Sequence, residues 1–206
     1  MKLRYSDIKK LENFLEKIKS DTYPEPPTSL HTNITKKVID YFFNKFSLPP
    51  QAKILDIGCG QGVALELFAA KGYHPIGITL NNEDVAICQE KGYEVYEMDQ
   101  SFLDFDNETF DLIWCRHCLE HSIFPYFTLN EIYRVTKPQG YLYIEVPAPE
   151  TSCQHQSNRN HYSVLGKPMW LELIKRSGFK IADTIDIDFT VPAGPDTYWA
   201  MIQQKT

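Results

Sequence analysis

The spacing of apolar residues divides the chain into two N-terminal helices and a longer region of alternating strands and helices. Apolar side chains recur every three or four residues over 6–19 and again over 33–46, which predicts two amphipathic helices. The prolines between them favour an extended segment, and Pro49-Pro50 ends this N-terminal region. A change of pattern follows at residue 52.

From there, short apolar runs alternate with stretches of helical periodicity. The expected strands cover 52–57, 74–80, 93–98, 110–115 and 141–146, and the expected helices cover 62–71, 82–91, 126–137 and 167–177. Strands that alternate with helices in this way predict a parallel sheet covered on both faces. Near the end, residues 185–189 and 197–203 are separated only by a short loop rich in proline and glycine, which predicts an antiparallel hairpin at the edge of the sheet.

Composition narrows the choice of partner and compartment. A length of 206 residues suits a single core, and the net charge of -6 argues against nucleic acid as the main partner. The five cysteines are odd in number and lie mostly in apolar runs, which favours a reducing compartment over a disulfide framework. No apolar run approaches the roughly 20 residues that span a bilayer, so we expect a cytoplasmic protein that does not bind a membrane. We further expect a monomer or homodimer that acts on a small molecule and does not bind nucleic acid.

The first expected strand ends in an acidic residue and continues into a glycine loop, Asp56-Ile57-Gly58-Cys59-Gly60-Gln61-Gly62. Glycines let a backbone approach a ligand closely, and the helix after the loop adds exposed N–H groups. A dinucleotide site requires the spacing G-x-G-x-x-G, whereas the third glycine here comes one residue early. Asp56 would repel a pyrophosphate but attract an α-ammonium group. The loop therefore favours a cofactor that carries an amino acid.

The run 54–62 closely resembles the first motif of class I S-adenosylmethionine-dependent methyltransferases. Segments similar to later motifs of this family follow in the same order, at Met98-Asp99, at 110–121 and at 134–142. The resemblance implies a Rossmann-like α/β fold, in which a seven-stranded, mostly parallel sheet with one antiparallel edge strand forms the middle of three αβα layers. It also implies an N-terminal helical lid segment over 1–50 and a methyltransferase domain over 51–206.

The same resemblance implies that the cofactor is S-adenosylmethionine, which leaves as S-adenosylhomocysteine. The residues implied to bind it are Asp56, Gly58, Cys59, Gly60, Thr79, Leu80, Asp99, Gln100, Ser101 and Arg116. One position departs from the family pattern, because Thr79 stands where an acidic residue usually binds both ribose hydroxyls. The candidates for the missing contact are Asn81, Asn82 and Glu83.

Two histidines after the fourth strand are the candidate catalytic residues. His117 and His121 follow that strand at the carboxyl edge of the sheet, where open α/β folds bind ligands, and imidazole suits proton removal near neutrality. His121 is the preferred base, and the alternative is a structural histidine that braces the loop. The spacing Cys115-x-x-Cys118-x-x-His121 suggests zinc, but structural zinc sites usually need four ligands and Cys115 ends an apolar strand. We therefore expect no metal site.

The stretch 147–165 is the longest interruption of the strand and helix pattern, as is typical of loops that contact substrates. Its candidate substrate-binding residues are His155, Arg159, His161 and Tyr162. The alternatives are a solvated loop charge and a helix cap at Ser163. Tyr5, Tyr23 and His31 belong to the expected lid, and for them we expect surface or packing roles.

These features predict an enzyme that transfers a methyl group to O, N or C of a small molecule, with a histidine as possible general base. A second hypothesis keeps the cofactor but changes the chemistry, as in cyclopropanation or aminopropyl transfer. A third is a non-catalytic regulatory module on the same fold.

Overall fold

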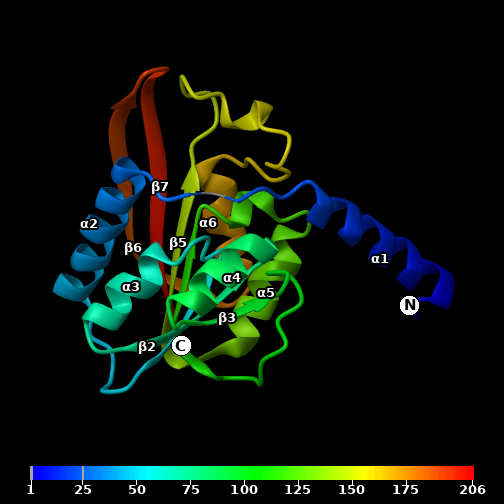
Figure 1. The fold of residues 1–206 in the computed structure, drawn as a ribbon, viewed down its shortest axis with the longest axis horizontal. Coiled ribbons are helices and arrows are strands. Elements are labelled where there is room, and N and C mark those ends of the chain that lie inside the picture. The colour runs from blue at the N-terminus through cyan, green and yellow to red at the C-terminus, as the bar shows by residue number, and fades with distance from the viewer. Residues whose placement is uncertain (1, 25) are drawn as a thin grey trace.

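A seven-stranded sheet with helices on both faces forms the body of the protein (Figure 1). The computed structural model describes residues 2–24 and 26–206. The strands are β1 (Lys53–Ile57), β2 (His74–Thr79), β3 (Glu94–Glu97), β4 (Phe110–Arg116), β5 (Thr136–Pro147), β6 (Phe179–Val191) and β7 (Gly194–Lys205). The helices are α1 (Tyr5–Ser20), α2 (Ser29–Lys45), α3 (Val63–Ala70), α4 (Asn82–Glu90), α5 (Pro125–Val135) and α6 (Lys167–Arg176), with short 3₁₀ helices η1 (Leu119–His121) and η2 (His155–Ser157).

The strand order is β3-β2-β1-β4-β5-β7-β6. The first five strands run parallel, and β7 runs antiparallel to both of its neighbours, β5 and β6. The predicted α/β fold, the mostly parallel sheet and the closing hairpin are therefore confirmed. Because the parallel strands all end at one edge of the sheet, the loops that follow them meet there.

The boundary between α5 and β5 differs from the prediction. The helix expected over 126–137 ends at Val135, and the strand expected at 141 already begins at Thr136, opposite Phe110. Proline at position 138 cannot donate a helical hydrogen bond. Gly140 is required because a Cβ there would lie 2.9 Å from the carbonyl oxygen of Lys137. The sequence pattern therefore extended this helix two residues too far.

Two hydrophobic layers sandwich the sheet. On one face, α2 and α3 cover a cluster that includes Phe42 and the stacked rings of Trp114 and Tyr143, whose centroids lie 3.8 Å apart. On the other face, α5 and α6 cover a second cluster that includes Trp170. In contrast, α1 projects away from the body (Figure 1), and of its residues only Ile18 is buried.

Within residues 2–24 and 26–206, no helix is both long enough and apolar enough to cross a bilayer.

Phe42 tests the packing of α2. We expect Phe42→Ala to lower the free energy of unfolding by about 3–5 kcal/mol, because its ring is fully buried and its loss leaves a cavity. Phe14 in α1 is the matched control, since its ring is 44% exposed. Phe14→Ala should change the same quantity by less than about 0.5 kcal/mol. Urea unfolding followed by circular dichroism measures both variants, and equal losses would contradict the described packing of α2.

Candidate functional site

Two cavities open side by side at the carboxyl edge of the parallel strands. The first has a volume of about 960 Å³ including its open mouth, and the second about 1040 Å³. Residues from the loops after β1 and β4 line both cavities, namely Gly58, Gly60, His117 and His121. The two cavities therefore meet between these two loops.

The loop after β1 has the backbone shape that its glycines predict. Gly58 and Gly60 have positive φ angles of 73° and 48°. A Cβ at Gly58 would lie 2.7 Å from Sγ of Cys118, so only glycine fits where the loops after β1 and β4 touch. The amides of Gly58 and Cys59 donate to the carbonyl of Ile78, which ties this loop to the end of β2. Cys59 itself is buried and lies in the wall of the second cavity.

Three charged side chains from neighbouring strands lie on the α2 face of the sheet. Asp56 on β1 is in register with Trp114 on β4, and Arg116 follows two residues later on the same face. Arg116 is in register with Glu145 on β5, and its Nε lies 2.8 Å from Oε1 of that carboxylate. Glu145 is fully buried and accepts a 2.6 Å hydrogen bond from the hydroxyl of Tyr143. The strand register thus places a cation between two buried acids.

The two acids differ in how well they are paired. Although burial opposes ionisation, Arg116, His117 and Tyr143 together lower the pKa of Glu145 to about 2. At Asp56, which is 3% exposed, burial raises the pKa to about 7 and Arg116 opposes the shift only in part. Asp56 is therefore a buried carboxylate short of positive charge, at the end of the strand that leads into the glycine loop.

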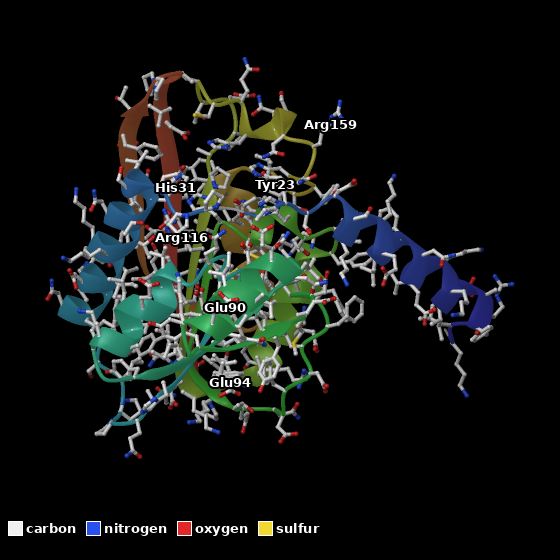
Figure 2. All side chains as sticks on the ribbon, viewed as in Figure 1. Tyr23, His31, Glu90, Glu94, Arg116 and Arg159 are labelled. Atoms are coloured by element: carbon white, nitrogen blue, oxygen red, sulfur yellow. The ribbon has the colours of Figure 1, made fainter. Side chains whose placement is uncertain are left out.

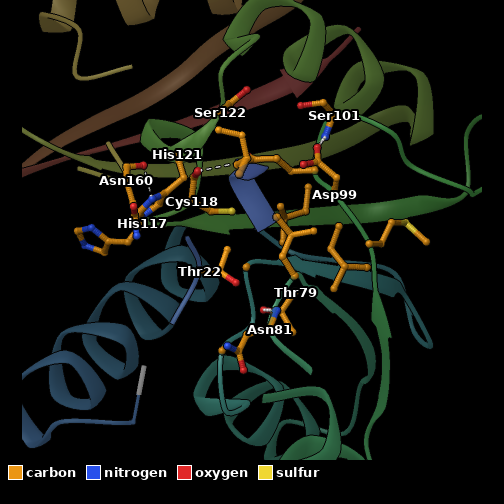
Figure 3. A pocket seen from close by; sticks show the side chains of 18 of the residues that line it. Thr22, Thr79, Asn81, Asp99, Ser101, His117, Cys118, His121, Ser122 and Asn160 are labelled. Atoms are coloured by element: carbon orange, nitrogen blue, oxygen red, sulfur yellow. Dashed lines mark hydrogen bonds between the residues drawn. The ribbon is translucent and has the colours of Figure 1, made fainter. Parts of the chain in front are cut away.

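The first cavity contains five more of the residues expected to bind the cofactor, whereas Arg116 and Cys59 line the second cavity and Asp56 lines neither. Thr79, Leu80, Asp99, Gln100 and Ser101 line the first cavity, together with apolar side chains such as Met98 (Figure 3). Asp99 is oriented by the Ser101 amide, which donates to its Oδ1 at 2.7 Å. Gln100 donates from Nε2 to the carbonyl of Cys118 at 2.9 Å, so it also links this wall to the loop after β4.

The wall beside Thr79 contains a carboxylate that the sequence pattern did not single out. Asp84 on α4 lines the cavity and is 3% exposed. Of the candidates named for the missing ribose contact, Asn81 lines the same wall, but its Oδ1 accepts the amides of Glu83 and Asp84 as the cap of α4. Asp84, five positions after Thr79, thus brings a carboxylate to the end of the cavity where the sequence lacks the expected acidic residue.

His117 is held between two glutamates. Its φ of 51° is left-handed, its amide donates to the Glu145 carbonyl, and its Nε2 lies 2.9 Å from Oε1 of Glu145. Its Nδ1 lies 3.4 Å from Oε1 of Glu120. Burial and Arg116 lower the pKa of His117, but the hydrogen bonds to both glutamates outweigh them and raise it overall. Because both ring nitrogens face glutamate oxygens, His117 is better suited to a structural role as a cation than to the role of a base.

Only one of the two ring nitrogens of His121, Nδ1, forms a hydrogen bond among the described residues. Its Nδ1 lies 2.8 Å from the carbonyl oxygen of Asn160 (Figure 3), in the loop after β5. A carbonyl can only accept, so Nδ1 carries the proton and Nε2 keeps a lone pair. His121 therefore remains the stronger candidate for contact with an acceptor.

The loop after β5 brings only part of its expected set together. His155 and His161 line the second cavity and stack with ring centroids 5.9 Å apart. Tyr162 lines the first cavity instead, at 38% exposure. Arg159 lies outside the described walls of both cavities and stands at the outer rim of its loop (Figure 2). Arg159 is exposed, as a solvated loop charge would be.

Sequence reasoning did not assign three residues that line the two cavities. His31 of α2 lines the second cavity, and Tyr198 of β7 lies against the His117 ring, with centroids 4.1 Å apart. Tyr23 lines the first cavity. Tyr23 and His31, for which we expected surface or packing roles, thus lie in the walls of the two cavities. Tyr5, at 74% exposure, fits that expectation.

The sequence profile of a family described as methyltransferase domain matches residues 31–181, which is most of the chain. The chain belongs to the methyltransferase domain family. The expected cofactor of this family, S-adenosylmethionine, also appears in the description of a similar solved structure, a SAM-dependent methyltransferase from Archaeoglobus fulgidus.

Curated relatives of the methyltransferase domain resemble about half of the chain. A ubiquinone biosynthesis O-methyltransferase of Pseudomonas putida is 33% identical over 98 residues, which are 44% of this chain and 42% of that protein. A phthiotriol/phenolphthiotriol dimycocerosates methyltransferase of Mycobacterium leprae is 36% identical over 100 residues, covering 44% and 36%. The chain thus spans less than half the length of these relatives.

Solved structures share the fold over most of the methyltransferase domain. The Archaeoglobus fulgidus structure has a TM-score of 0.70 and 20% identity, covering 84% of this chain and 94% of its own. The [4+2]-cyclase SpnF has a TM-score of 0.68 and 19% identity, covering 82% and 80%. At these identities the likeness concerns the fold alone.

The residues of the first cavity fit S-adenosylmethionine. Gly58 and Gly60 place backbone without side chains in the wall of this cavity, where the methionine part can approach it. Asp56 lines neither cavity, but it ends the strand directly before this loop, and its carboxylate, short of positive charge, suits the ammonium group. Asp84 and Asp99 offer carboxylates for polar groups of the nucleoside, and apolar side chains such as Met98 suit the base. When bound, the cofactor supplies an electrophilic methyl group on a sulfonium.

Two positive-φ glycines form a matched pair for testing the loop. We expect Gly58→Ala to destabilise the protein more than Gly72→Ala, although both backbones are left-handed, at 73° and 86°. A Cβ at Gly58 meets Cys118, whereas at Gly72 no atom of the described residues lies within 4 Å. Gly58→Ala should also weaken S-adenosylhomocysteine binding, measured by calorimetry. Equal effects of the two variants would show that backbone strain alone sets the cost.

The raised pKa of Asp56 predicts how cofactor binding depends on pH. If the ammonium group requires an ionised Asp56, affinity for S-adenosylhomocysteine should fall about tenfold between about pH 8 and about pH 6, as the ionised fraction of a group with a pKa of about 7 falls. Asp56→Asn should bind weakly at both values, because it has no charge to lose. Calorimetry across this range decides, and a flat profile for the unmodified protein would contradict the role of Asp56.

Proposed function

We propose that this protein transfers a methyl group from S-adenosylmethionine, held in the first cavity, to an oxygen of a small molecule bound in the second. The observation that carries the proposal is that the two cavities meet at Gly58, Gly60, His117 and His121. In-line displacement requires donor and acceptor to approach from opposite sides of one point, and this junction offers such a point.

The second cavity is lined by groups that suit a polar acceptor. Arg116, His31, His155 and His161 provide hydrogen-bond donors around it, and Glu120 provides an acceptor. An O-methyltransferase among the relatives supports oxygen as the receiving atom.

His121 is the residue that we assign to activation of the acceptor. Its Nδ1–H is fixed on the Asn160 carbonyl, and its Nε2 lone pair remains for the acceptor hydroxyl or for a group that binds it. His117 positions the surrounding charges, since both of its nitrogens face glutamates.

We infer that the part of the N-terminal region before α2 acts as a lid, because α2 itself packs into the core of the sheet through Phe42. Ile18, Thr22 and Tyr23 contribute to the first cavity, whereas Pro27 and His31 contribute to the second. Residues from this region thus contribute to the walls of both cavities.

Release of S-adenosylhomocysteine in a screen of hydroxylated metabolites tests this function. We expect one class of acceptor to give turnover, with His121→Asn lowering kcat at least about tenfold while leaving S-adenosylhomocysteine affinity nearly unchanged. His74→Asn is the control, because His74 is exposed at the start of β2, at the opposite end of that strand. No heat of S-adenosylhomocysteine binding to the folded protein would contradict the proposal at its first step.

A further inference from the structure

Three side chains with metal-ligating atoms meet where the two cavities join. Glu120 and His121 lie in η1, His161 lies in the loop after β5, and one ligand atom from each falls within 4.8 Å of the other two. We propose that these residues bind a divalent transition-metal ion, and that this ion holds the acceptor oxygen. This inference rests on the proposed function and deepens its account of His121.

The polar atoms at this position are short of partners. Among the described residues, Oε2 of Glu120 and Nδ1 of His161 are buried and have no hydrogen-bond partner. Glu120 is 1% exposed, and only its other oxygen faces His117. A buried polar atom left unpaired costs about 1–3 kcal/mol. One cation between the two residues would satisfy both atoms at once.

The third ligand is oriented as metal-bound histidines usually are. His121 donates from Nδ1 to the Asn160 carbonyl at 2.8 Å, which leaves the Nε2 lone pair for an ion. The rings of His121 and His161 lie nearly perpendicular, at 87°, with centroids 4.7 Å apart. Since Asn160 directly precedes His161, one short segment both orients one histidine and supplies the other.

The distances are close to those of a metal site. Two ligands on one zinc ion, each about 2.1 Å from it, lie at most about 4.2 Å apart. The three ligand atoms lie within 4.8 Å of one another, so binding an ion requires only small side-chain movements. Two imidazoles and one carboxylate suit zinc and related first-row ions, and three protein ligands leave coordination positions open. All three residues line the second cavity, so an open position faces the acceptor.

A cation at this place changes how the acceptor is activated. It lowers the pKa of a hydroxyl that binds it, so that the proton passes to solvent at neutral pH. The acceptor oxygen then forms a bond to the methyl carbon, and the carbon–sulfur bond breaks with its electron pair left on sulfur. His121 acts as a ligand in this scheme and takes up no proton.

The proposed ligands are not those of the motif considered in the sequence, Cys115-x-x-Cys118-x-x-His121. We expected no metal site because that motif fits zinc poorly. Neither cysteine takes part. His161 comes from a loop 40 positions beyond His121 in the chain, and no local motif joins the two.

A second group of potential ligands provides an internal comparison. Cys153, His155 and Asp196 also place ligand atoms within 4.8 Å of one another. There, however, Nε2 of His155 lies 3.0 Å from both carboxylate oxygens of Asp196, so the acid and the imidazole satisfy each other. The group of Glu120, His121 and His161 is therefore the better candidate for a metal site, because two of its buried polar atoms have no hydrogen-bond partner.

Equilibrium dialysis of the 206-residue chain against zinc, followed by metal analysis, tests the proposal. We expect one high-affinity zinc ion per chain, and His121→Asn and His161→Asn should each lower the affinity at least about tenfold. His74→Asn, His155→Asn and Cys153→Ser should retain it. Circular dichroism confirms folding of each variant, and the cobalt(II) form should change its visible spectrum when catechol is added as an oxygen ligand.

Every outcome of this experiment bears on the assignment. Zinc lost from His155→Asn or Cys153→Ser but kept by His161→Asn would move the ion to the second group and overturn the proposal. Zinc binding that no variant weakens, or no binding at all, would overturn it as well. Calorimetry with S-adenosylhomocysteine on the same samples separates the two levels, since a failure of cofactor binding contradicts the proposed function regardless of zinc.

Discussion

The site depends on one cation, the guanidinium of Arg116, which lies between the buried acids of neighbouring strands. It forms an ion pair with Glu145 and partly offsets the desolvation of Asp56. A buried carboxylate without such a partner would become protonated or destabilise the fold. Because Arg116 is the last residue of β4, its pairing also fixes where the loop after β4 begins.

That starting point determines the geometry of the catalytic region. His117 follows Arg116 with a left-handed backbone and reaches the same Glu145, so β4 and β5 together set the direction of the loop. The turn then presents Glu120 and His121 to the loop after β5, where the Asn160 carbonyl accepts from His121. A buried ion pair in the sheet thereby positions groups at the junction of two cavities.

The order of the parts explains how one chain can bind a cofactor and a separate acceptor. The loops after β1, β2 and β3 build the first cavity, whereas α2, the loop after β5 and β7 build most of the second. The loops after β1 and β4 supply the residues that line both cavities, namely Gly58, Gly60, His117 and His121. The loop after β5 and the N-terminal region also contribute residues to each cavity, such as Tyr162 to the first and His161 to the second, so these segments link the acceptor side to the cofactor side.

The sequence by itself determined the strands, most helix boundaries, the hairpin and the glycine loop, because these follow from local periodicity and from glycine stereochemistry. Only the tertiary structure decided that Asp84 reaches the cofactor cavity, that His31 and Tyr198 line the acceptor cavity, and that Arg159 stands outside it. Likewise, no pattern along the chain joins His161 to Glu120. Such neighbours depend on strand register and on how long loops fold over the sheet edge, and neither is encoded in the spacing of nearby residues.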